Sequence, residues 1–162
     1  MTDHDISQLS FLIVDDNQHM LSIIRETLRA FGVSRVYDAR DAAEGFEHFR
    51  LSPVDILIVD YLMEPLDGLD FIRLIRTAGD SPNRQVPIIL LTAYTERFRV
   101  ASARDAGATE ILCKPISANK LYARIQSIIT NPRAFIKSPR YTGPDRRRAQ
   151  SGTYMGPERR KS

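Results

Sequence analysis

The 162-residue sequence has a single cysteine, no tryptophan and no apolar run near the ~20 residues that a membrane-spanning helix needs. One cysteine, Cys113, excludes an internal disulfide and is typical of a reducing compartment. Residues 1–5 are acidic at two positions and lack the basic-then-apolar order of a secretory signal. These absences together predict a cytoplasmic protein without a membrane span.

Positive charge is scarce in most of the sequence and concentrated near its end. Residues 1–131 contain 14 Lys and Arg against 18 Asp and Glu, whereas residues 132–162 contain 9 against 2. The net charge of +3 therefore hides a division into −4 and +7. Because like charges repel and opposite charges attract, any binding of anions is expected in the final segment.

Short apolar runs alternate with amphipathic stretches through the first 131 residues. The amphipathic stretches have helical spacing, and the first and fourth are followed by Gly32 and Gly107, which are typical helix ends. Continuous apolar strands between helices predict a parallel sheet covered on both faces. Right-handed crossovers then give an α/β fold with a doubly wound, flavodoxin-like sheet and five helices. The five predicted strands are residues 11–14, 36–37, 56–59, 86–91 and 111–113.

Polar residues directly follow four of these strands. In a doubly wound sheet the functional groups lie at this place, the carboxyl ends of the strands. Asp15 and Asp16 follow the first strand, Asp60 the third, Thr92 the fourth and Lys114 the fifth. Three carboxylates this close repel one another, which favours a bound divalent cation. All-oxygen ligands indicate Mg²⁺ rather than zinc. Taken alone, the first acidic pair could instead cap the following helix.

A carboxylate beside Mg²⁺ can attack a phosphoryl group and hold it as an acyl phosphate. Catalysis of such a transfer consists mostly of positioning and charge neutralisation, for which an ammonium and a hydroxyl are suited. Lys114 and Thr92 provide these groups beside Asp60.

The order and spacing of these residues resemble the receiver domain of two-component response regulators over roughly residues 9–131. The resemblance implies that Asp60 accepts phosphate from a histidine kinase or a histidine phosphotransfer protein, with Thr92 and Lys114 as catalytic residues. It implies a Mg²⁺ site made by Asp15, Asp16, Asp60 and the Leu62 backbone carbonyl, and a cis Lys114-Pro115 peptide. The matching segments are Val14-Asp15-Asp16, Val59-Asp60, Met63, Asp67-Gly68, Leu91-Thr92-Ala93, Ala106-Gly107-Ala108 and Lys114-Pro115.

Some positions depart from the family pattern. Ile111 stands where an aromatic residue often accompanies the switch from inactive to active form, and Tyr94 is the candidate to share that role. Leu62 and Tyr94 flank the expected reaction path, and both are too bulky and apolar to orient an attacking water. The sequence therefore predicts slow self-dephosphorylation and no enzymatic activity beyond self-catalysed phosphotransfer.

Residues 132–162 form a second unit, a basic segment with an internal repeat. Residues 141–148 read YTGPDRRR and residues 154–161 read YMGPERRK. The Gly-Pro pairs argue against a continuous helix or strand, so we expect an extended or disordered segment. It would serve as a solubilising extension, order on a partner, contact phosphates of nucleic acid or an anionic membrane, or fold back on the acidic body. The candidate binding residues are Tyr141, Arg146, Arg147, Arg148, Tyr154, Arg159 and Arg160.

The sequence thus predicts a bacterial regulator that signals by phosphorylation-dependent binding to a downstream protein that the sequence does not identify. A phosphate shuttle or sink in a relay and a nucleic-acid-binding regulator acting through the basic segment are alternatives, and a homodimer stays open. No helix-turn-helix pattern is present, so we expect no sequence-specific DNA binding. An aspartyl-phosphate hydrolase would need a second aspartate where Leu62 stands, so that class is rejected.

Overall fold

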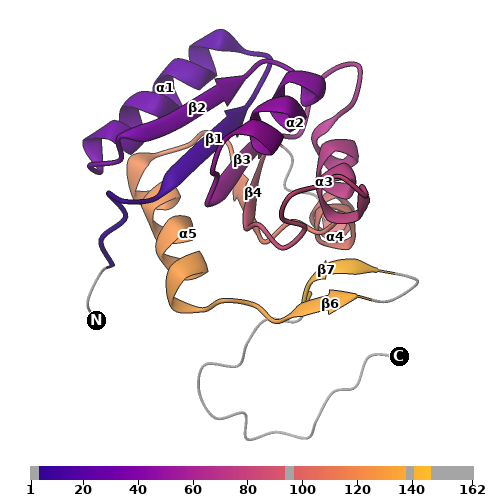
Figure 1. Cartoon of the computed structure of the whole chain (residues 1–162). Coiled ribbons are helices and arrows are strands. Elements are labelled where there is room, and N and C mark those ends of the chain that lie inside the picture. Colours follow the sequence, from indigo (N-terminus) through magenta and orange to yellow (C-terminus); the bar gives the residue numbers. More distant parts are fainter. Residues whose placement is uncertain (1–3, 94–96, 138–140, 147–162) are drawn as a thin grey trace, which may run out of the picture.

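In the computed structural model, which describes residues 4–93, 97–137 and 141–146, five parallel strands form one sheet in the order β2-β1-β3-β4-β5 (Figure 1). Strands β1, β3 and β4 are buried at every position. Burial on both faces explains why these runs are continuously apolar rather than alternating. The predicted doubly wound parallel sheet is confirmed. The strands are β1 (Ser10–Val14), β2 (Arg35–Ala39), β3 (Ile56–Asp60), β4 (Ile88–Thr92) and β5 (Glu110–Cys113).

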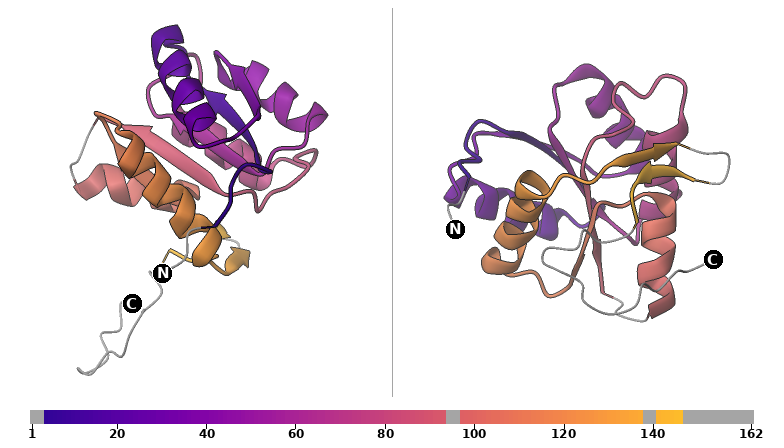
Figure 2. Two further views of the ribbon diagram at one scale, coloured as in Figure 1. Left: turned by 90° about the vertical axis from the view of Figure 1, so that its left-hand side faces the viewer. Right: turned by 90° about the horizontal axis from the view of Figure 1, so that it is seen from below.

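Five helices cover the two faces of the sheet. Helices α1 (Gln18–Ala30) and α5 (Ala118–Thr130) share one hydrophobic core with the sheet and lie toward the viewer in the left view of Figure 2. Helices α2 (Ala42–Leu51), α3 (Gly68–Thr77) and α4 (Arg97–Ala106) cover the opposite face. Gly32 and Gly107 have φ angles of 94° and 115° and follow α1 and α4. In this left-handed region a glycine is favoured, which agrees with their predicted role as helix ends.

The basic segment departs from the sequence prediction. Residues Phe135–Lys137 (β6) and Thr142–Pro144 (β7) form an antiparallel hairpin. The expectation that residues around the first Gly-Pro pair form no strand is therefore wrong. Pro144 is tolerated because it is the last residue of β7, an edge strand of a two-stranded sheet, where the missing backbone N–H costs little. The right view of Figure 2 shows the hairpin lying beside α4.

The hairpin lies at the amino-terminal edge of the sheet, next to the residues that precede β4 and β5. It borders a cavity of about 230 Å³ whose lining includes Gln85, Pro87 and Thr109, which precede β4 and β5. The first repeat thus folds back on the body, one of the alternatives that the sequence left open. Arg147, Arg148, Tyr154, Arg159 and Arg160 lie outside the described residues, and their binding role stays a prediction.

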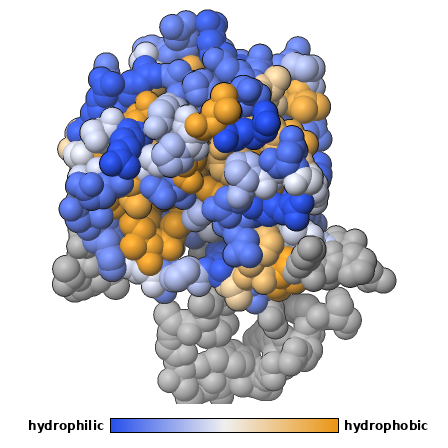
Figure 3. Space-filling view, viewed as in Figure 1, coloured by the Kyte–Doolittle hydropathy of each residue, from blue (hydrophilic) through white to orange (hydrophobic). Residues whose placement is uncertain are grey.

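The face shown in Figure 3 is mostly hydrophilic, with small separate hydrophobic patches. Within the described residues, no helix combines the length and the apolar character that crossing a membrane requires.

Candidate functional site

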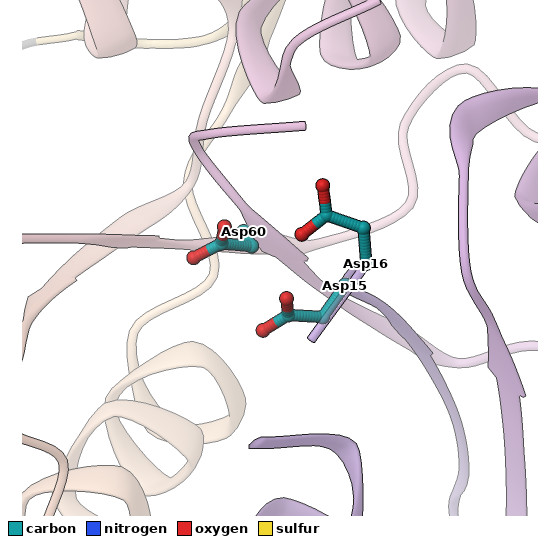
Figure 4. A group of neighbouring side chains, drawn as sticks. All are labelled: Asp15, Asp16 and Asp60. Atoms are coloured by element: carbon teal, nitrogen blue, oxygen red, sulfur yellow. The ribbon is translucent and has the colours of Figure 1, made fainter. Parts of the chain in front are cut away.

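Three carboxylates meet at the carboxyl edge of the sheet. Asp60 is the last residue of β3, and Asp15 and Asp16 directly follow the neighbouring strand β1. Because the register pairs Val14 with Val59, Asp15 comes level with Asp60. One oxygen of each carboxylate lies within 4.8 Å of the others, and Figure 4 shows the three side chains around a common space. The structure therefore brings together the three side chains that the sequence proposed as metal ligands.

Asp15 is the most confined of the three. Its side chain is fully buried, its Oδ1 accepts a hydrogen bond from the Asn17 N–H at 2.9 Å, and its Oδ2 has no hydrogen-bond partner among the described residues. Burial raises the pKa of Asp15 to about 6, against the lowering effect of the Asn17 bond, and the charge of Asp60 raises it further. A buried carboxylate oxygen without a partner carries a free-energy penalty that a cation would relieve.

Asp60 combines burial with a cationic partner. Burial raises the pKa of Asp60, whereas its hydrogen bond and charge interaction with Lys114 lower it, and Asp16 raises it again. The Lys114 Nζ lies 2.6 Å from Asp60 Oδ1. This distance is that of a charge-assisted hydrogen bond. The lysine is therefore aimed at the residue for which the sequence proposed the phosphoacceptor role.

The ends of β5 and β4 position Lys114 and Thr92 at the carboxyl edge of the sheet. Lys114 follows β5, its N–H donates to the Thr92 carbonyl at 2.8 Å, and its peptide bond to Pro115 is cis, as the resemblance implied. Thr92 is buried at the end of β4 and pairs with Cys113, while the preceding residue of β4 pairs with Asp60. The end of β4 therefore places Thr92 at the same edge as the carboxylates.

The donor set of this edge fits a small divalent cation. It consists of carboxylate oxygens, one of them unpartnered and buried, without sulfur or imidazole among the grouped residues. Hard cations such as Mg²⁺ bind through oxygen ligands of this kind. Asp15, Asp16 and Asp60 would hold the ion. The Leu62 carbonyl as a further ligand stays a prediction.

The start of α3 contains one residue whose packing role the sequence did not reveal. At Gly68, the first residue of α3, a Cβ would collide with the Asp60 carbonyl oxygen and would come within 3.0 Å of the Tyr61 Cα. The Gly68 N–H donates to the Tyr61 carbonyl at 2.8 Å. The loop therefore packs directly against the backbone of Asp60, and only glycine fits. The Asp67-Gly68 pair was the available signal, but spacing alone did not show this contact.

The two residues proposed for switching are not brought into the site by any described contact. Ile111 is partly buried and packs against the core beneath α2, α3 and α4. Tyr94 lies outside the described residues. Their roles stay predictions.

Comparison with known proteins identifies the family of this chain. A family model described as "Response regulator receiver domain" matches residues 11–126. The chain belongs to this family. Its fold is that of the receiver domain of two-component response regulators.

Individual relatives are 26% to 34% identical to this receiver domain over the aligned residues. "Probable chemotaxis protein CheY" of Rhizobium etli is 30% identical over 122 residues, which are 75% of this chain and 92% of that protein. "Probable transcriptional regulator ycf27" of Cyanidium caldarium is 34% identical over 122 residues, and the chain spans 47% of its length. The structure of the chemotaxis protein CheY4 of Vibrio cholerae superposes with a TM-score of 0.68 at 26% identity, covering 74% of this chain and 98% of that one.

Proposed function

We propose that Asp60 of this receiver domain accepts a phosphoryl group from the phosphohistidine of a histidine kinase or a histidine phosphotransfer protein. The observation that carries the proposal is the position of Asp60. The Lys114 ammonium lies 2.6 Å from its carboxylate, and an oxygen of each of Asp15 and Asp16 lies within 4.8 Å of an Asp60 oxygen. An anionic nucleophile, a cation and a metal-binding pair on one edge are the parts that phosphoryl transfer to a carboxylate needs.

In this reaction Asp60 is the nucleophile, and Lys114 and Thr92 bind oxygens of the phosphoryl group. A carboxylate oxygen of Asp60 forms the new bond to phosphorus while the bond from phosphorus to the imidazole nitrogen breaks, and that nitrogen keeps the electron pair. Lys114 is placed to exchange its bond to Asp60 Oδ1 for one to a phosphoryl oxygen. The Thr92 hydroxyl, at the end of the adjacent strand, would donate to another. Mg²⁺, when held by the three aspartates, neutralises charge on the transferring group.

We further propose that phosphorylation changes the affinity of this chain for a downstream protein, and that the chain catalyses only its own phosphotransfer and a slow loss of phosphate. Support for signalling comes from the ion pair between Lys114 and Asp60. A phosphoryl group on Asp60 would replace the present contact between Asp60, at the end of β3, and Lys114, which follows β5. Such a change can shift an equilibrium between two arrangements of nearby elements.

Phosphorylation by a small donor tests the site. With Mg²⁺ and acetyl phosphate, the wild-type protein is expected to gain one phosphoryl group that hydroxylamine removes, measured by mass spectrometry, and Asp60→Asn none. Asp80→Asn, at an exposed carboxylate after α3, is the matched control and should behave as wild type. Lys114→Met should slow labelling about 100-fold, because it removes one charge-neutralising donor. Labelling of Asp60→Asn at the wild-type level would refute the assignment.

Transfer onward separates signalling from a shuttle. If the labelled protein rapidly passes phosphate back to a histidine phosphotransfer protein, the shuttle is favoured over stable signalling. The alternative of nucleic-acid binding is tested by salt-dependent binding to RNA and DNA with and without charge reversal of the basic segment.

A further inference from the structure

The repeated sequence of the basic segment has a defined binding mode in its first copy. Tyr141 is buried, and its hydroxyl donates to the Pro144 carbonyl at 2.7 Å. The Arg146 guanidinium lies 4.2 Å from the centre of the Tyr141 ring, and its Nη1 lies 2.7 Å from an Asp105 carboxylate oxygen. The side chains of the repeated tyrosine and first arginine therefore make specific contacts, and the tyrosine hydroxyl bonds the backbone of the repeated proline.

The repeated glycine is required by close packing. At Gly143 a Cβ would lie 2.5 Å from the Tyr141 hydroxyl oxygen and 3.1 Å from the Gly107 Cα. The Gly107 Cα belongs to the backbone of the body, which cannot move aside as a flexible side chain would. A side chain at this position would have to displace the Tyr141 ring and press on the Gly107 backbone, so it disfavours the observed docking.

The surface that receives the first copy, which we call the socket, consists of Arg76, Asp105, Gly107 and strand β6. Arg76 is fully buried, and its Nε and Nη2 donate to the Gly107 carbonyl at 3.0 and 2.8 Å. The ring of Phe135, in β6, lies 5.6 Å from the Arg76 guanidinium carbon. The socket is thus held by buried hydrogen bonds that do not involve the repeat itself.

Only the half of the hairpin that enters the socket is duplicated. The second copy, residues 154–161, repeats the tyrosine, glycine, proline, acidic residue and arginines at the same spacing. The Phe-Ile-Lys sequence of β6, by contrast, has no counterpart in residues 147–153. The two copies therefore share one β6 and one socket.

We propose that the socket is a binding site for Tyr-x-Gly-Pro-acid-Arg segments, and that residues 154–159 occupy it in place of residues 141–146 of the same chain. The second copy supplies the same groups: Tyr154 for the buried ring, Gly156 for the close approach and Arg159 for the contact with Asp105. At any moment one copy is docked and the other is free.

Loop length sets the balance between the two states. With the first copy docked, residues 138–141 connect β6 to β7, a loop of 4 residues; with the second copy docked, residues 138–154 make a loop of 17 residues. Loop-closure entropy grows with the three-halves power of length, so equal contacts would favour the first copy about ninefold. The second copy then occupies the socket in roughly one molecule in ten.

Four full-length proteins test the exchange: wild type, Gly143→Val, Gly156→Val and the double variant. The probe is a fluorescein-labelled peptide of residues 152–161, and its affinity is measured by fluorescence anisotropy. The double variant, whose socket is open, should bind it most tightly. Gly143→Val should bind more weakly, because its own second copy competes at a high effective concentration. Gly156→Val should bind about ninefold more weakly again, and wild type as weakly as Gly156→Val.

The controls separate docking from attraction between a basic peptide and an acidic body. The same peptide carrying Gly156→Val keeps its charge and should not bind, and an unlabelled peptide of residues 139–148 should compete for the site. Equal affinity of Gly143→Val and the double variant would overturn the exchange. So would failure of the double variant to bind the probe, binding of the control peptide, or formation of dimers by Gly143→Val in size-exclusion chromatography.

A second series keeps the test decisive if the valine variants do not fold, as judged by circular dichroism. Arg146→Glu and Arg159→Glu, singly and together, weaken the contact with exposed Asp105 without adding volume to the packed interface. The same order of affinities is expected over a smaller range. Affinities that do not differ among these variants would overturn the proposal.

Discussion

Replacing Asp15 by asparagine removes a buried negative charge while keeping the shape of the side chain. The Oδ1 position can still accept the Asn17 N–H, and the amide that replaces the unpartnered Oδ2 can donate to neighbouring carboxylates. A rise in the Asp15 pKa from 3.8 to about 6 corresponds to about 3 kcal/mol of unfavourable free energy for the charged form in the folded protein. We therefore expect Asp15→Asn to raise the free energy of unfolding of the metal-free protein by about 1–3 kcal/mol at pH 7.

The pH dependence of the free energy of unfolding tests separately whether charged Asp15 destabilises the folded protein. Because the folded-state pKa of Asp15 lies above its value when exposed, proton uptake favours the folded state. Its contribution is complete below pH 3.8 and is lost as the pH rises through about 6. Between pH 7 and pH 5 the wild-type protein should therefore gain about 1 kcal/mol from this group, and Asp15→Asn should not.

Urea unfolding followed by far-ultraviolet circular dichroism, with EDTA present, measures both effects. Asp80→Asn, at an exposed carboxylate, is the matched control and should leave stability within about 0.5 kcal/mol. Added Mg²⁺ should stabilise wild type and have less effect on Asp15→Asn, because one ligand is lost. The reasoning is refuted if Asp15→Asn destabilises the metal-free protein at pH 7, or if the difference from wild type is the same at pH 5.

Two further substitutions test the loop after β3. Leu62→Asn should accelerate loss of phosphate from the phosphorylated protein about tenfold, because an amide can orient the attacking water; Leu66→Asn, exposed in the same loop, should not. Decay measured by mass spectrometry at equal or slower rate in Leu62→Asn would contradict this. Gly68→Ala should lower the free energy of unfolding by about 2–3 kcal/mol and slow phosphorylation, because its Cβ meets the phosphoacceptor backbone. Gly79→Ala, which meets nothing within 4 Å, should change stability little, and similar urea midpoints for the two variants would contradict the packing argument.

The residues of the carboxyl edge could be predicted because their positions follow from chain direction alone. In a parallel sheet every strand ends at the same edge, so an acidic pair after β1 and an aspartate after β3 must be neighbours. The sequence contained both the apolar runs that define the strands and the polar residues that follow them. No information about side-chain packing was needed to bring Asp15, Asp16 and Asp60 within 4.8 Å of one another.

Arg76 could not be predicted in the same way, because arginine is usually exposed. It follows Ile75 and lies four residues after Ile72, which places it on the apolar face of α3. In the structure it is fully buried, has no carboxylate partner among the described residues, and donates to the carbonyls of Arg84, Val86 and Gly107. Burial lowers the pKa of Arg76 to about 10, so the charge is retained at pH 7. Those acceptors come from distant segments, and only the folded chain brings them together.

The hairpin was missed for a related physical reason. The Gly143-Pro144 pair argues against a strand when only local propensity is considered, and that inference holds for an isolated peptide. In the folded chain, Gly143 and Pro144 are buried, and Gly143 packs against a distant part of the chain around Gly107. Glycine permits close approach to Gly107, and Pro144 is buried at the edge of the sheet. In the first copy, the Gly-Pro pair therefore belongs to a packed hairpin and does not mark a break in structure. The duplication makes the proposed exchange testable, because a second copy with the same residues should fit the same socket.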